Sequence, residues 1–170
     1  MRVSVIGHRK APEGPELVVR IYETLFDLIV NQGVDTFYFG SKSRFDTFCF
    51  EAVMELRHSY PHVKTVYVRA NYEHIEKSYE DYLLESYDET YYPDTVRDSH
   101  ELCYVIRDAA LVEVCDVLLT YCATNYEPPR KTPKNKMMAP VETAKKPKSG
   151  TQMAVLFAKK RKKRIINLFR

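Results

Sequence analysis

Residues 2–7 read RVSVIG, residues 35–40 read DTFYFG and residues 63–68 read VKTVYV. Each run is short and rich in β-branched or aromatic residues, as buried strands are, and the first two close on a glycine. Between them, residues 13–33 and 45–56 carry apolar side chains at spacings of three and four, which predicts amphipathic helices. Strands alternating with helices over short connections predict a parallel sheet.

The rest of the chain continues the alternation. A helix from about Asp98 to Glu113, a strand at 116–121, a helix from Gly150 to Lys163 and a strand at 165–168 are expected. The fold class is therefore α/β, a three-layer Rossmann-like open sheet of about five mainly parallel strands with helices on both faces. Residues 1–170 form a single domain. Among the side chains expected to face the core are Val18, Leu102 and Met153.

Two segments break this pattern. Residues 71–97 form an acidic, Tyr-rich segment, and six of the 13 tyrosines fall between Asn71 and Pro93. We expect a short, partly exposed helix and loop over an edge of the sheet. Residues 123–148 hold five prolines and seven Lys/Arg, which predicts a long basic loop. Either segment is placed to act as a lid over a ligand.

Composition excludes several classes of protein. The chain has no stretch of 18 apolar residues, so no membrane span or membrane partner is expected. Its N-terminus lacks the pattern of a secretory signal. Four widely spaced cysteines without a CxxC pair indicate thiols in a reducing compartment. We therefore expect a soluble cytoplasmic protein without a metal site or a resident cofactor.

Charge is unevenly distributed along the chain. Residues 1–122 carry 12 Lys/Arg against 21 acids, a balance of −9, whereas residues 123–170 carry 14 Lys/Arg against two acids, a balance of +12. The basic end includes the run KKRKKR at Lys159–Arg164. Such asymmetry fits a polyanionic partner such as nucleic acid, and it equally fits neutralisation within the fold or between subunits. A solvated helix face is the plain interpretation of the run.

Ligands of open parallel sheets bind beyond the carboxyl ends of the strands, where strand order reverses. The loops at this edge supply small, hydroxyl-bearing and basic residues, and Ser149–Thr151 open the last helix, where backbone N–H groups suit an anion. The candidates are Gly7, His8, Arg9, Gly40, Ser41, Lys42, Tyr121, Ser149, Gly150 and Thr151. We expect these groups to gather at one rim and grip negatively charged oxygens. No catalytic residue is assigned.

Each candidate also has a purely structural interpretation. Gly7 and Gly40 can serve as strand-end turns, Ser149 as a helix N-cap, and His8 as an exposed loop residue rather than an acid–base group. Arg107 lies among apolar neighbours on the predicted third helix, where an arginine needs an anion or a carboxylate. The sequence leaves these alternatives open.

Four stretches together resemble the SLOG superfamily, which includes the DprA/Smf proteins, the YpsA-like proteins and the LOG-type nucleotide phosphoribohydrolases. They are VIGHR (5–9), FGSKSRFD (39–46), IRDAALVEVCDVLLTY (106–121) and KSGTQMAVLFAKKRKKRIINL (148–168). The chain looks most like small YpsA-like or phage-type members. This resemblance implies a pocket for a nucleotide or a nucleotide-derived signalling molecule, and it adds Asp46 and Arg107 to the lining.

The chain departs from the LOG pattern in three ways. In the motif PGGxGTxxE the leading Pro-Gly-Gly is missing, and Ala154 stands where the catalytic glutamate would be. On the preceding helix, Asp108 replaces the lysine that usually follows the arginine. The resemblance therefore implies a sensor or sequestering protein for an ADP-ribose/NAD-like compound or a cyclic nucleotide. The alternatives are an N-glycosidase that uses Asp46 or Glu51 instead, and nucleic-acid binding in the DprA manner. Members of this superfamily often pair through helices, so the resemblance is compatible with a homo-oligomer, and the sequence itself leaves the oligomeric state open.

Overall fold

The computed structural model describes residues 1–11, 14–97, 102–123 and 149–169. Six strands are present, namely β1 (Arg2–Gly7), β2 (Thr36–Phe39), β3 (Lys64–Val68), β4 (Glu89–Tyr91), β5 (Val117–Tyr121) and β6 (Arg164–Asn167). Between them lie α1 (Pro15–Val30), α2 (Arg44–Arg57), α3 (Lys77–Leu84), the 3₁₀ turn η1 (Asp94–Val96), α4 (Cys103–Val114) and α5 (Gly150–Lys160). The basic loop predicted at 123–148 lies outside the described residues, except for Ala123.

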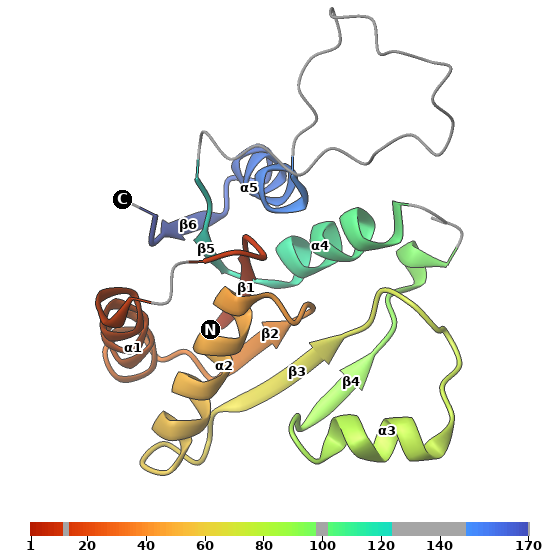
Figure 1. Cartoon of the computed structure of the whole chain (residues 1–170), viewed down its shortest axis with the longest axis horizontal. Helices are drawn as coiled ribbons and strands as arrows, with labels where there is room; N and C mark the ends of the chain where they lie inside the picture. The colour runs from red at the N-terminus through yellow and green to blue at the C-terminus, as the bar shows by residue number, and fades with distance from the viewer. Residues whose placement is uncertain (12–13, 98–101, 124–148, 170) are drawn as a thin grey trace, which may run out of the picture.

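The strands form one open, fully parallel sheet in the order β4-β3-β2-β1-β5-β6 (Figure 1). The predicted α/β class with a mainly parallel sheet is confirmed. From β1 the chain builds outward through β2, β3 and β4, and it then returns to place β5 on the other side of β1. Strand order therefore reverses between β1 and β5, which defines the switch point of the sheet.

Alternation along the strands divides the core into two layers, because successive side chains of a strand face opposite ways. Val3, Val5 and Leu119 join the buried residues of α1 and α2 on one face. Ile6 and Leu118 join those of α4 and α5 on the other. The sheet is thus covered on both faces, as a three-layer fold requires (Figure 1).

The acidic, Tyr-rich segment contains a strand that the sequence did not predict. After α3, residues Glu89–Tyr91 pair in parallel with Val66–Val68 and become the edge strand β4. Asp88 fixes the start of this strand, because its carboxylate accepts a bond from the Thr65 backbone N–H at 2.7 Å and pairs with Arg57 at 2.8 Å. The expected helix is α3, but the expected loop over the sheet edge is wrong, since the segment extends the sheet itself.

Three side chains expected in the core lie outside it. Val18 is 42% exposed, Leu102 59% and Met153 41%. These residues lie in the helical layers on the two faces of the sheet. The strip of a helix that contacts the sheet is narrower than its apolar face, so apolar residues at the edge of that face stay exposed. Leu102 also precedes the first residue of α4, so it does not share the helix's buried face.

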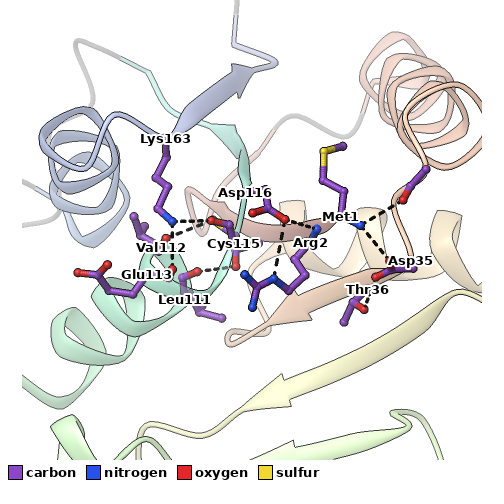
Figure 2. A network of polar contacts seen from close by, with 12 residues as sticks. Met1, Arg2, Asp35, Thr36, Leu111, Val112, Glu113, Cys115, Asp116 and Lys163 are labelled. Atoms are coloured by element: carbon purple, nitrogen blue, oxygen red, sulfur yellow. Dashed lines mark hydrogen bonds and ion pairs between the residues drawn. The ribbon is translucent and has the colours of Figure 1, made fainter.

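Charged groups at the amino ends of the strands pair with one another (Figure 2). The Met1 amine lies 2.9 Å from a carboxylate oxygen of Asp35, and Asp116 accepts a bond from the Arg2 backbone N–H at 2.7 Å. Lys163 donates to the Cys115 carbonyl at 2.8 Å, just beyond the end of α4. These contacts hold the amino ends of the strands together.

Among the described residues, no helix is both long and apolar enough to cross a bilayer.

Candidate functional site

The candidate residues gather at the carboxyl edge of the sheet, next to the switch point. The loops after β1 and β5 are joined by a bond from the His8 N–H to the Tyr121 carbonyl at 3.1 Å. The loop after β1 also meets the start of α2, where the Arg44 N–H reaches the Arg9 carbonyl at 3.4 Å. The loops after β1, β2 and β5 therefore form one continuous surface.

Asp46 lies between the loop after β1 and the loop after β2. Its carboxylate accepts bonds from the Gly7 N–H at 3.2 Å and from the Ser41 and Ser43 hydroxyls, both at 2.6 Å. Ser43 also caps α2 by accepting the Asp46 N–H. The donors that the sequence assigned to an outside anion thus hold the chain's own carboxylate. Gly7 is required here, because a Cβ would lie 2.3 Å from the Phe45 ring.

Burial dominates the acid–base behaviour of Asp46, which is 2% exposed. Loss of water raises the pKa of its carboxyl to about 6, against the opposing effect of the two serine hydroxyls. The nearby charge of Asp108 adds to the rise. Asp46 is therefore a carboxylate that takes up a proton far more readily than an exposed aspartate.

Arg107 is the buried cation of the site, 3% exposed at the carboxyl ends of β2 and β3. Its guanidinium packs on Gly40, where a Cβ would lie 2.6 Å from Nη1. Nε donates to Asp108 at 2.8 Å and Nη1 to the Val68 carbonyl at 3.3 Å. The expected carboxylate partner is therefore present. Of the five guanidinium N–H groups, these two are the ones with an acceptor among the described residues.

Asp108 links Arg107 to the first turn of α5. A Cβ on Gly150 would lie 3.5 Å from Asp108 Oδ2, so this carboxyl group faces the positive end of the helix. Burial raises the pKa of Asp108, against the opposing charge of Arg107. Asp108 was noted in the sequence only as a departure from the LOG pattern. The structure makes it a member of the site.

The start of α5 combines a structural cap with a buried hydroxyl. Ser149 accepts the Gln152 N–H, and Gln152 returns a bond to the Ser149 N–H, which is a capping box. The N-cap interpretation of Ser149 is confirmed. Thr151 follows Gly150 in the first turn of α5 and is 7% exposed.

His8 and Tyr121 are buried at the same edge. His8 is 2% exposed, so the interpretation as an exposed loop residue is wrong. Burial lowers the pKa of the imidazole, against a hydrogen bond with the backbone of Ala123 that raises it, which favours a neutral ring. The Tyr121 ring packs against Phe45 and Phe169, so its contacts are those of a core residue.

Arg9 and Lys42 are the exposed cations of the rim. The Lys42 ammonium lies 5.5 Å from the centre of the Tyr82 ring, which stacks on Tyr79 from the same helix, α3. The Tyr-rich segment thus borders the site through α3. A pocket of about 150 Å³ opens beside Lys42 and is lined by Ser41, Lys42, Asp46, Thr47, Phe50 and Tyr87.

Two further residues escaped the sequence analysis. Tyr67 on β3 lies within electrostatic range of Arg107, Lys42 and Asp46, and burial raises its pKa. Thr120 on β5 is fully buried, and its hydroxyl has no partner among the described residues. The signal for Thr120 was available, because it is the one polar residue in the run VLLTY.

The basic run at Lys159–Arg164 is partly engaged within the fold. Arg161 pairs with Glu113 at 2.6 Å, and Lys163 donates to backbone carbonyls at the end of α4. These contacts are those of a surface helix end. They fit the internal neutralisation that the charge balance left open.

The protein-family models and the curated proteins contain no match to this chain. The SLOG resemblance therefore stays a prediction from the four stretches that carry it. No cluster of three or more His, Cys, Asp or Glu that could hold a metal ion occurs in residues 1–11, 14–97, 102–123 and 149–169.

Proposed function

We propose that this protein binds a nucleotide or a nucleotide-derived signalling molecule at the carboxyl edge of the sheet, as a sensor or a sequestering protein. One observation carries the proposal, namely the buried Arg107 guanidinium with three N–H groups uncommitted among the described residues. A buried guanidinium that is not saturated by the protein suits a phosphate, which accepts paired bonds in the same plane.

The surroundings of Arg107 fit a phosphate group. The first N–H groups of α5 point toward the same edge, and the helix dipole favours an anion there. The Thr151 hydroxyl offers a further donor, and the exposed cations Arg9 and Lys42 stand at the rim. Asp108 competes for this position, but burial already raises its pKa, which lowers the cost of neutralising it when an anion enters.

Binding is favoured over N-glycoside hydrolysis. Ala154, at the position of the glutamate in the LOG pattern, is a buried core residue between α4 and α5. Of the proposed substitutes, Glu51 lies on the exposed side of α2, and Asp46 is held by three donors from the protein. The carboxylate that does face the α5 turn, Asp108, is engaged by Arg107 Nε at 2.8 Å.

A thermal-shift screen with mono-, di- and cyclic nucleotides, ADP-ribose and NAD tests this proposal. A ligand at 100 times its Kd adds about 2.7 kcal/mol to stability, so at least one compound of the panel is expected to raise the Tm. Chromatography of the same mixtures is expected to recover the ligand intact. A panel without any stabilising compound would contradict nucleotide binding, and release of free base would favour the hydrolase.

A further inference from the structure

The pocket beside Asp46 is small. Its volume of about 150 Å³ is similar to that of cavities that take up benzene, and well below the roughly 300–1,000 Å³ of sites that enclose a drug-sized molecule. It therefore fits one small planar ring system of a ligand rather than an entire nucleotide. It lies between the first turns of α2, the loop after β2 and Tyr87.

Two of the three hydroxyl groups around the pocket have already donated their hydrogens. Ser41 donates to Asp46 Oδ2 at 2.6 Å, and Thr47 donates to the Ser43 carbonyl at 3.1 Å. What these two hydroxyls still offer is lone pairs, although Ser41 Oγ already accepts the Ser43 N–H at 3.1 Å and has room for one further bond. Asp46 Oδ2 accepts the Ser41 bond and has room for one more, because each carboxylate oxygen accepts about two.

The pocket therefore presents acceptors to whatever enters it. A phosphate carries acceptors and negative charge of its own, so the Asp46 side of the pocket opposes it. A group with N–H or O–H donors suits the same atoms. Lys42 and the Tyr87 hydroxyl are the lining groups whose polar hydrogens have no acceptor among the described residues.

One wall of the pocket is formed by the aromatic rings of Phe50 and Tyr87, which pack against further aromatic rings of the core. The Phe50 and Tyr87 ring centres are 4.8 Å apart, and Tyr87 packs further on Tyr67 at 5.1 Å and on Phe39 at 6.1 Å. A ring held by three neighbours keeps its orientation, and a planar ligand ring gains contact area on such a surface. Flat shape and hydrogen-bond donors are thus required together.

We propose that this pocket receives the amino-bearing base of the nucleotide, of the adenine or cytosine type, with the amino group donating to Asp46 Oδ2 or Ser41 Oγ. This inference rests on the proposed function, because it assigns the base end of the ligand whose phosphate meets Arg107. Asp46 then serves as a specificity residue for the base.

Calorimetric titration at pH 7.5 with AMP, IMP, ribose 5-phosphate and adenosine tests the assignment. AMP is expected to bind at least about tenfold more tightly than IMP, which has a carbonyl in place of the amino group, and than ribose 5-phosphate, which has no base. Thr47→Trp fills the pocket from an exposed position of α2. It is expected to reduce AMP binding to the level of ribose 5-phosphate and to leave ribose 5-phosphate unchanged. Glu55→Trp, two turns further along α2, is the matched control and retains the preference for AMP.

The outcomes separate the two proposals. Equal binding of AMP and ribose 5-phosphate, or an AMP preference that survives Thr47→Trp, overturns the base pocket alone. Equal binding of AMP and IMP overturns the role of the amino group. Adenosine binding that Thr47→Trp abolishes, without any binding of ribose 5-phosphate, supports the pocket and contradicts the phosphate position. No binding of any of the four compounds overturns both.

Discussion

The key charged side chains are partly exposed at the amino ends of the strands and buried at the carboxyl ends. At the amino end, the Asp35 and Asp116 carboxylates in Figure 2 are partly exposed and each accepts bonds from a donor beside it, and hydrogen bonds from Thr36 and the Met1 amine lower the pKa of Asp35. At the carboxyl end, Asp46 and Arg107 are almost completely buried, and burial raises the pKa of Asp46.

This difference separates structural charge from functional charge. Exposed, paired groups hold strands in register at little cost in desolvation. A buried carboxylate with a raised pKa, and a buried guanidinium with uncommitted donors, lower the stability of the folded chain. Sites that violate local rules in this way are where function is expected.

The largest expected effect is the pH dependence of stability at Asp46. Because its folded pKa of about 6 exceeds the unfolded value of 3.8, the folded protein binds more protons between these values, and stability falls as pH rises from about 4 to 6. Relative to Asp46→Asn, the wild type is expected to lose about 3 kcal/mol between about pH 3 and pH 7, of which about 2 kcal/mol is lost between about pH 4 and pH 6. Urea unfolding at a series of pH values measures it.

Asp116→Asn at the amino end is the matched control. Asp116 is 44% exposed, so the substitution is expected to change stability by less than about 1 kcal/mol. Parallel pH profiles for Asp46→Asn and the wild type would remove the distinction between the two ends.

The next effect concerns the crowded glycine of the carboxyl end. Gly7→Ala places a Cβ 2.3 Å from the buried Phe45 ring, so a destabilisation of about 1–3 kcal/mol is expected from overpacking. Gly14→Ala, with no atom within 4 Å of its Cβ, is expected to stay within about 0.5 kcal/mol of the wild type. Thermal unfolding compares the two, and a tolerated Gly7→Ala would mean that β1 and α2 adjust to each other easily.

Helices and strands could be predicted from the sequence where a segment had a clear hydrophobic periodicity. The runs at 2–7, 35–40 and 63–68 became strands, and the helices between them buried the expected stripes around Leu25 and Val53. β4 was missed because a three-residue edge strand carries too few residues to display alternation. Its position is set by Asp88 and by pairing with β3, which are contacts between distant segments.

The location of the site could be predicted from the sequence, but the hydrogen bonds and ion pairs within it could not. Strand topology and glycine positions indicated which loops meet, and Gly7, Gly40 and Arg107 do lie at that edge. That Asp46 would take up the Gly7 N–H, and that Asp108 would face Gly150, depends on how α2, α4 and α5 dock against the sheet. Such docking leaves no periodic trace in the sequence. The Ser149–Gln152 capping box, in contrast, was there to be read.

The smallest effect is expected at the amino end. Lys163→Met removes an ammonium that donates to the Glu113 and Cys115 carbonyls at the end of α4. A loss of about 1 kcal/mol is expected from the hydrogen bonds and the helix dipole. Chemical denaturation measures the loss, and a cost above about 3 kcal/mol would show that this end also holds strongly coupled charge.

The most direct test of the central claim is the nucleotide affinity of Arg107→Gln beside that of Lys163→Met, measured by calorimetry with the best compound of the screen and with folding checked by circular dichroism. Both substitutions remove a cation that donates to the chain, one at each end of the sheet. We expect Arg107→Gln to weaken binding tenfold or more and Lys163→Met to change it less than about twofold. Equal affinities for the wild type and a folded Arg107→Gln would contradict the assignment of the carboxyl edge as the anion site.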